Sequence, residues 1–187
     1  MSFTGAVLTG GRSTRMGRDK ALLEVGGRPL AGIGRDALVG AGARRVLAVG
    51  GDAVALSGLG FEVIGDGWPG EGPLGAVVTA LDAAADDAVV VLACDLPFVE
   101  PATVEAVLQA VLDGDADAAV PVNEGRLEVV VAAYRRRCGA VLRAAFERGE
   151  RALWRAVANL TVSPVMLAEP RWLTNANAPS DVAGAEL

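Results

Sequence analysis

Short apolar runs alternate with segments of helical periodicity over the first two-thirds of the chain. The apolar runs have the length of buried strands, and they span residues 3–8, 45–49, 61–64, 88–93 and 118–122. Helical periodicity marks residues 29–39, 74–85 and 101–112. Repeated strand–helix–strand units predict a mostly parallel, Rossmann-like sheet with helices on both faces. We therefore expect an α/β fold, built as one three-layer α/β/α domain.

The pattern changes after residue 122. The expected elements there are a β-rich run at 127–134, helices at 138–146 and 151–159, and a short strand at 162–167. A final capping segment is expected near Pro179. Because no linker or internal repeat separates the two parts, we expect a single domain over residues 1–187 with two halves that meet near residue 122.

The composition excludes several kinds of chemistry. The 187 residues include no histidine, which rules out a Ser-His-Asp triad, a Cys-His pair and an imidazole metal site. Two cysteines, Cys94 and Cys138, are too few for a zinc-thiolate site or a disulfide scaffold. The net charge of -6 argues against nucleic acid or an anionic membrane as the main partner. We expect a cytoplasmic protein, since the start has no secretory pattern and no apolar run approaches the ~20 residues of a membrane span.

The loop after the first expected strand combines glycines with cations. It reads GGRSTRMGRDK and places Arg12, Arg15, Arg18 and Lys20 within nine positions. Glycines let the backbone approach a ligand closely, and the cations suit a polyphosphate. The spacing matches neither a Walker loop nor a Rossmann fingerprint, so neither an ATPase nor a dehydrogenase is favoured. The alternative is a solvated basic loop. Lys20 stands out because the other 16 basic residues are all arginine.

Carboxylates follow two further expected strands. Asp66 opens a loop rich in glycine and proline, and Asp95 follows directly after the apolar run at 88–93. An aspartate at the carboxyl end of a buried strand is a typical oxygen ligand for Mg²⁺ shared with phosphates. The alternative for both aspartates is a turn or a helix N-cap. Cys94 is expected to be a small buried apolar residue, since no histidine is present to activate it.

These segments, taken in order, resemble the nucleotidyltransferase superfamily, and within it the MobA-type molybdenum cofactor guanylyltransferase family. Residues 8–11 (LTGG) are similar to the family's LAGG opening, and residues 15–20 match its RMG…DK. The later motifs are GPLG at 72–75, CDLPF at 94–98, GER at 149–151 and N-x-N at 175–177. The resemblance runs from about residue 5 to the end of the chain, and the combination with GER and N-x-N is its more specific part.

The resemblance implies a role for each motif. Residues 1–122 would bind the nucleotide and residues 123–187 would form the acceptor-binding elaboration. The implied nucleotide-binding residues are Leu8, Thr9, Gly10, Gly11, Lys20, Asp66 and Asp95. Arg15, Lys20 and Asp95 would be catalytic, with Asp95 binding Mg²⁺. The pterin of the acceptor would lie near Arg151, Asn175 and Asn177, for which turn formation is the alternative.

The implied reaction transfers GMP from GTP to the terminal phosphate of molybdenum-molybdopterin, and pyrophosphate leaves. That phosphate is largely ionised near neutral pH, so the reaction needs no general base and suits a chain without histidine. Catalysis then depends on positioning and on charge neutralisation by Mg²⁺ and cations. Further partners that the resemblance suggests are cofactor-insertion proteins and molybdoenzymes.

The chain departs from the family at three places. Gly50 and Gly51 stand where the family often has asparagine, Leu127-Glu128 where many members have Gln-Pro or His-Pro, and Ala178 where threonine is usual. A carboxylate at position 128 is unexpected beside an anionic acceptor. The alternatives are a molybdopterin cytidylyltransferase or another small CTP-using enzyme, and a nucleotide-binding module without catalysis. A sugar-phosphate nucleotidyltransferase is a third, for which the chain is short.

Overall fold

A computed structural model describes residues 2–11 and 19–176 and shows a mixed sheet between two helical layers. Along the sheet the strand order is β10-β7-β9-β6-β1-β4-β5, with β8 paired to β7. The parallel strands of the first part are β1 (Thr4–Leu8), β4 (Arg45–Val49), β5 (Glu62–Ile64) and β6 (Ala88–Ala93). The α/β fold class predicted from the alternation is confirmed.

The remaining strands extend the sheet on the β6 side. They are β7 (Ala118–Asn123), β8 (Arg126–Leu127), β9 (Val131–Arg135) and β10 (Val162–Val165). Strand β9 is antiparallel to both β6 and β7, whereas β10 is parallel to β7. The two halves of the chain therefore share one sheet, in which β6 and β7 run in the same direction.

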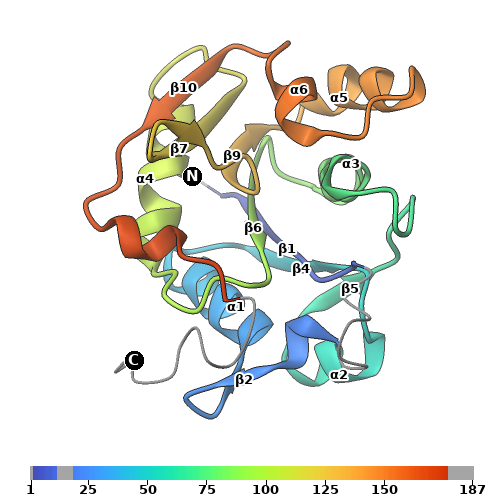
Figure 1. The fold of residues 1–187 in the computed structure, drawn as a ribbon, viewed down its shortest axis with the longest axis vertical. Coiled ribbons are helices and arrows are strands. Elements are labelled where there is room, and N and C mark those ends of the chain that lie inside the picture. The colour runs from blue at the N-terminus through green and yellow to red at the C-terminus, as the bar shows by residue number, and fades with distance from the viewer. Residues whose placement is uncertain (1, 12–18, 177–187) are drawn as a thin grey trace.

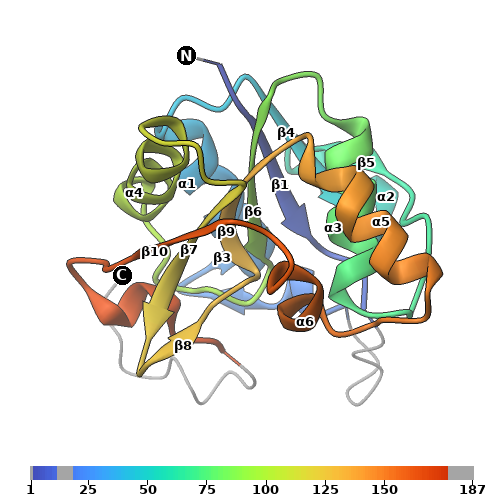
Figure 2. The same ribbon diagram turned by 90° about the horizontal axis from the view of Figure 1, so that it is seen from above.

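Four helices cover the two faces of the sheet. Figure 2 shows α1 (Leu30–Gly40) and α4 (Pro101–Leu112) on one face, and α3 (Pro73–Ala83) and α5 (Cys138–Glu147) on the other. Side chains of β6 alternate between the two layers, as a strand requires: Val90 and Leu92 join one core cluster, and Val89 and Val91 join the other. This burial on both faces explains why β6 is a continuous apolar run.

Several short elements were not predicted. They are η2 (Lys20–Leu22), the hairpin of β2 (Glu24–Val25) and β3 (Arg28–Pro29), α2 (Ala53–Gly58) and η3 (Pro170–Leu173). Helix α2 has a single buried residue, Leu56, so it lacks the apolar stripe by which helices are recognised in a sequence. A side-chain cap starts it instead, because the Asp52 carboxylate accepts hydrogen bonds from the N–H groups of Val54 and Ala55.

Most predicted elements differ from the structure by one or two residues at an end, and two differ by more. The β-rich run at 127–134 is interrupted because the Val131 N–H donates to the carbonyl of Glu128, which turns the chain between β8 and β9. The helix expected over 151–159 is only α6 (Leu153–Val157). The Glu150 carboxylate accepts from the N–H groups of Arg151 and Ala152, and this turn places Arg151 before the helix and Ala152 at its N-cap. The capping segment expected near Pro179 lies outside the described residues.

The two halves interleave in the sheet, because β7, the last strand of the first half, lies between β9 and β10 of the second half (Figure 1). The predicted division of labour between residues 1–122 and 123–187 stays a prediction. Within residues 2–11 and 19–176, no helix combines the length and the apolar character that crossing a membrane requires.

Candidate functional site

Three adjacent parallel strands end at one pocket. The loops after β1, β4 and β5 enclose a cavity of about 480 Å³, lined by Thr9, Gly10, Gly11, Asp19, Gly50, Gly51, Asp66, Pro69 and Gly70. Ligands of open α/β sheets bind at this carboxyl edge, because the loops that leave the strands converge there. Of the residues predicted to hold a nucleotide, the structure places Thr9, Gly10, Gly11 and Asp66 in this lining.

Close backbone packing shapes the wall of the pocket at Gly10. Its N–H donates to the Val49 carbonyl at 2.7 Å, and a Cβ at this position would lie 3.2 Å from that same oxygen. The neighbouring Thr9 hydroxyl donates to the Gly50 carbonyl at 2.8 Å, which joins the loops after β1 and β4. The Leu8 side chain, by contrast, is buried in the core, so only its backbone faces the end of the strand.

The departure at Gly50 has a packing reason. Gly50 has a φ of +75°, and a Cβ there would lie 2.9 Å from the Gly10 Cα. Such a distance requires one of the two loops to move. Gly51 also has a positive φ, of +80°. The two glycines therefore allow the loop after β4 to lie directly against the loop after β1.

The two oxygens of Asp66 do different things. Oδ1 accepts a hydrogen bond from the Trp68 N–H at 2.9 Å, which is the turn that the sequence offered as the alternative role. Oδ2 lies on the side of Gly10, 3.6 Å from where a Cβ of that glycine would stand. One carboxylate thus stabilises the loop and also presents an acceptor oxygen to the pocket.

Lys20 and Asp95, 75 positions apart, form an ion pair beside this pocket. Lys20 Nζ lies 2.6 Å from Asp95 Oδ2, and each side chain is 19% exposed. Asp95 follows β6, the strand next to β1, and Lys20 begins η2. The structure therefore brings together the lysine and the aspartate that the sequence predicted to be catalytic. Arg15, the third predicted catalytic residue, lies outside the described residues.

Asp19 is a pocket residue that the sequence interpretation passed over. Its carboxylate accepts from the Ala21 N–H at 3.0 Å and from the Asp52 N–H at 3.3 Å. It caps η2, which carries Lys20, and ties that element to the loop after β4. The available signal was its position directly before Lys20 at the end of the glycine-rich loop.

The predicted acceptor residues lie in two places. Asn175 is brought to Asp95 by its neighbour, because the Ala176 N–H donates to the Asp95 carbonyl at 2.8 Å. Arg151 lies instead beside the loop that leads into α3, with its Nε 2.6 Å from Glu71 Oε2 and its guanidinium 4.0 Å from the centre of the Phe146 ring. Asn177 lies outside the described residues. Whether these side chains share a ligand stays a prediction.

The chemistry of Asp95 fits a magnesium ion held jointly with phosphates. Within the described ranges, no group of three or more Cys, Asp or Glu side chains gathers as a metal cage. Mg²⁺ does not require one, because it usually binds one or two carboxylates together with substrate phosphates and water. A partly exposed carboxylate at a strand end, beside a loop that can hold phosphate, is a donor of that kind.

Neither thiol is a nucleophile. Burial, reinforced by the charge of Asp95, raises the pKa of Cys94 to about 12. Burial also raises the pKa of Cys138 to about 12, with the charge of Asp117 as the second cause. Both thiols are therefore protonated at neutral pH, as the absence of histidine led us to expect for Cys94.

Known proteins resemble this chain over nearly its whole length. The family described as "MobA-like NTP transferase domain" matches residues 5–163. A probable molybdenum cofactor guanylyltransferase of Chloroflexus aggregans is 35% identical, with 97% of this chain and 92% of the relative covered. One of Opitutus terrae is 36% identical, with 96% and 93% covered. The crystal structure of molybdopterin-guanine dinucleotide biosynthesis protein A from Archaeoglobus fulgidus has a TM-score of 0.76 at 25% identity, covering 96% of this chain and 95% of its own.

Proposed function

The chain belongs to the MobA-like NTP transferase family, as its motifs predicted, and we propose that it transfers GMP from GTP to molybdenum-molybdopterin and releases pyrophosphate. The product is the guanine dinucleotide form of the molybdenum cofactor. The observation that carries the proposal is the Lys20–Asp95 pair, which lies at the carboxyl edge next to a glycine-walled pocket. A cation and a metal-binding carboxylate beside a cavity for a nucleotide are what this transfer requires.

The pocket binds the base and ribose of the nucleotide, and the ion pair binds its phosphates. The base and ribose lie against Thr9, Gly10 and Gly11, where the Asp66 carboxylate offers an acceptor to donor groups of the nucleotide. Lys20 binds the phosphates as a compact positive charge, and Arg15 is assigned to the same task on its motif alone. Phosphate oxygens compete with Asp95 for the Lys20 ammonium, so binding GTP rearranges the pair.

The bond changes need positioning and charge neutralisation rather than a base. An oxygen of the acceptor's terminal phosphate attacks the α-phosphorus of GTP. The bond from that phosphorus to the bridging oxygen breaks, and pyrophosphate leaves with the electron pair. Asp95 would hold Mg²⁺ together with the phosphates, and the ion would supply neutralisation of the charge on the leaving group. Lys20 stabilises the same charge from the protein side.

The acceptor site completes the proposal. The segment of Asn175 approaches Asp95 through the Ala176 hydrogen bond, so it lies where the acceptor phosphate has to arrive. We assign Asn175 to the acceptor on this ground and on its motif, and Asn177 and Arg151 on their motifs alone. The reaction is assigned to the cytoplasm, with cofactor-insertion proteins and molybdoenzymes as recipients of the product.

Pyrophosphate release tests the proposal directly. The chain is incubated with Mg²⁺ and either GTP or CTP, each with and without molybdopterin. We expect release that requires molybdopterin and is faster with GTP, together with a larger thermal shift by GTP than by CTP. Preference for CTP would make the chain a cytidylyltransferase. Binding of GTP without any release would make it a nucleotide-binding module.

A further inference from the structure

A second cavity lies between the β8–β9 turn and α6. Its volume is about 720 Å³, within the range of small-molecule sites, and its lining includes Leu127, Glu128, Val129, Val130, Trp154 and Val162. Figure 2 shows β8 and α6 at the same end of the sheet, the end toward which β1 points. We refer to this cavity as the β8–α6 hollow.

The hollow adjoins the reaction centre. Its residue Val130 accepts a hydrogen bond from the Ala93 N–H at 2.8 Å, and Ala93 is two residues before Asp95. On the far side, Leu127 of β8 pairs with Val122 at the carboxyl end of β7. A ligand in the hollow would therefore lie at the same edge of the sheet as the Lys20–Asp95 pair, on the side of the second half of the chain.

An apolar floor and an exposed indole suit a flat ring. Val129, Val130 and Val162 pack against the core beneath the hollow, while Trp154 is 60% exposed and Leu127 is 42% exposed. The Arg155 guanidinium lies 5.0 Å from the centre of the Trp154 ring and braces this side chain. Exposed tryptophan next to an apolar cavity favours stacking of a planar heterocycle.

Glu128 places a carboxylate in the lining of the hollow, and this carboxylate favours a ligand with N–H donors. Its backbone is anchored by two hydrogen bonds, from its own N–H to the Pro121 carbonyl and from the Val131 N–H to its carbonyl, both 2.9 Å. Within residues 2–11 and 19–176, no side chain or N–H pairs with its half-buried carboxylate. An ionised carboxylate offers two acceptor oxygens, so it is complementary to a ring edge with two adjacent N–H donors.

We propose that the β8–α6 hollow binds the 2-amino-4-oxopyrimidine ring of the acceptor's pterin, with Trp154 stacked on the ring and Glu128 accepting hydrogen bonds from its N3–H and 2-amino groups. The inference rests on the proposed function for the identity of the acceptor. It also accounts for the departure at position 128: a carboxylate would repel the acceptor's phosphate, but it attracts the ring edge at the other end of the molecule. Guanine carries the same donor edge, so the test has to separate pterin from guanine.

The first test is direct binding of 6-hydroxymethylpterin, followed by calorimetry, to the wild-type chain, Glu128→Gln and the control Glu124→Gln. Glu124 lies four residues away on the β7–β8 turn and is not part of the lining. Glutamine replaces one acceptor oxygen by a donor group, so we expect Glu128→Gln to weaken pterin binding about 10-fold or more, and Glu124→Gln to leave it unchanged. Absence of pterin binding by the wild-type chain, or equal binding by Glu128→Gln, would overturn the inference.

The same titrations with guanosine and cytidine test whether the hollow binds pterin or guanine, which carry the same edge of N–H donors. We expect Glu128→Gln to leave guanosine binding unchanged. A loss of guanosine binding with pterin binding intact would assign the hollow to guanine and overturn the proposal. Stacking is tested by Trp154→Phe, which should keep most of the pterin affinity, and Trp154→Ala, which should lose about 10-fold. Equal affinity of both variants with the wild type would exclude the stacking role.

Kinetics distinguish failure of this inference from failure of the proposed function. If the chain transfers GMP, Glu128→Gln should raise KM for molybdopterin about 10-fold while KM for GTP stays the same. Transfer with an unchanged KM for molybdopterin would refute the pterin site and leave the function standing. Glu128-dependent pterin binding without any pyrophosphate release would refute the function and leave the ring-binding hollow standing.

Discussion

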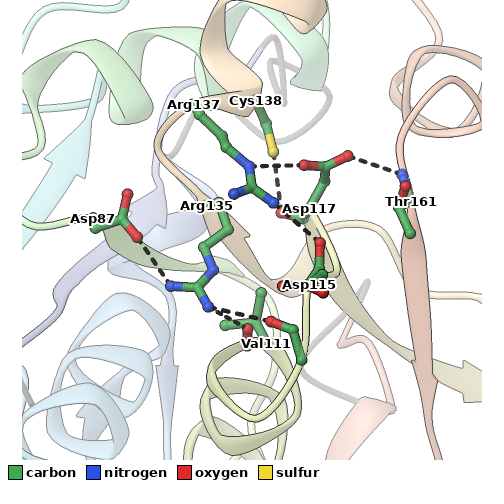
Figure 3. A network of polar contacts seen from close by, with 9 residues as sticks. Asp87, Val111, Asp115, Asp117, Arg135, Arg137, Cys138 and Thr161 are labelled. Carbon is green, nitrogen blue, oxygen red and sulfur yellow. Dashed lines mark hydrogen bonds and ion pairs between the residues drawn. The ribbon is translucent and has the colours of Figure 1, made fainter.

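The two edges of the sheet use the same kinds of charged residue in opposite ways. At the amino edge, where β6, β7 and β10 begin, charged side chains are joined into a network that also bonds to the backbone (Figure 3). Arg137 Nε lies 3.0 Å from Asp117 Oδ1, while Oδ2 of Asp117 accepts from the Thr161 N–H at 3.1 Å. Arg135 joins Asp87, before β6, to the Val111 carbonyl of α4.

At the carboxyl edge the charged side chains lie at or beside two larger cavities, of about 480 and 720 Å³. Asp66 presents Oδ2 to the first pocket, Glu128 lines the second, and the Lys20–Asp95 pair lies beside the first. Gly10 after β1 and Gly50 after β4 let their two loops meet, whereas side-chain contacts hold the starts of β6, β7 and β10. Charged side chains at the amino edge join neighbouring strands and bond to their backbone, and those at the carboxyl edge lie where the loops of the sheet can hold a ligand.

The largest expected effect comes from removing either partner of the Lys20–Asp95 pair. Lys20→Ala and Asp95→Ala should each lower the rate of GMP transfer about 10²–10³-fold, because in the proposed reaction each removes an electrostatic contact at the reacting phosphates. Arg137→Ala, from an exposed pair at the amino edge, is the matched control and should keep the wild-type rate. Pyrophosphate release measures the rates, and circular dichroism checks the fold. A wild-type rate in either site variant would remove that residue from the catalytic machinery.

A smaller effect is expected from alanine at Gly50, and comparison with alanine at Gly27 separates the cost of loop packing from that of backbone strain. Gly50 and Gly27 have φ values of +75° and +76°, but only at Gly50 would a Cβ collide, 2.9 Å from the Gly10 Cα. Gly27→Ala should cost about 1 kcal/mol of the free energy of unfolding, from strain alone. Gly50→Ala should cost more and weaken GTP binding about 10-fold. Denaturant unfolding and GTP titration measure both effects, and equal values for the two variants would contradict the packing account.

At the amino edge the expected effect is on stability alone. Asp117→Ala should lower the free energy of unfolding by about 1 kcal/mol, because the exposed hydrogen bonds from the Thr161 N–H and Arg137 lose their acceptor. The transfer rate should stay unchanged at a temperature where the variant is folded. A selective loss of rate in this variant would show that the division between the two edges does not hold.

The smallest expected effect is a change in acid stability. The backbone N–H of Thr161 is the main cause, and Arg137 a further one, that lowers the pKa of Asp117 below its ordinary value. A lowered folded-state pKa stabilises the fold fully above the ordinary Asp pKa of about 4, and this contribution is lost as pH falls through the folded-state pKa. Asp117→Asn should therefore lose less stability over that acid window than the wild type. Urea unfolding at successive pH values measures the difference, and parallel curves would contradict it.

The parts of the fold that the sequence predicted are those in which local pattern and tertiary burial agree. Strand β6 is apolar because both of its faces are buried, and Pro101 marks the start of α4. Helix α2 was missed because it depends on one buried leucine and the Asp52 cap. The break at Glu128 was missed as well, because hydrogen bonds to Pro121 and Val131 produce it, and neither partner is visible in a local apolar run.

The candidate site also has a part that the sequence predicted and a part that only the structure shows. Motifs identified Gly10, Lys20, Asp66 and Asp95 one by one, since each residue type has a chemical reason to stand at a strand end. The Gly50 departure looked like a lost contact in the sequence, and in the structure it is the position at which two loops meet. The β8–α6 hollow has no sequence signature, because its lining comes from three separate segments of the chain.

The sequence alone therefore determined which chemistry is available: no imidazole, one lysine, carboxylates after apolar strands and a glycine-rich loop. Tertiary structure decided which of these groups meet. It placed Lys20 within 2.6 Å of Asp95, brought the Asn175 segment to the same aspartate, and opened a cavity beside Glu128 and Trp154. The physical reason is that residue type and local spacing fix hydrogen-bonding capacity and charge, whereas the order and direction of strands in the sheet fix distance.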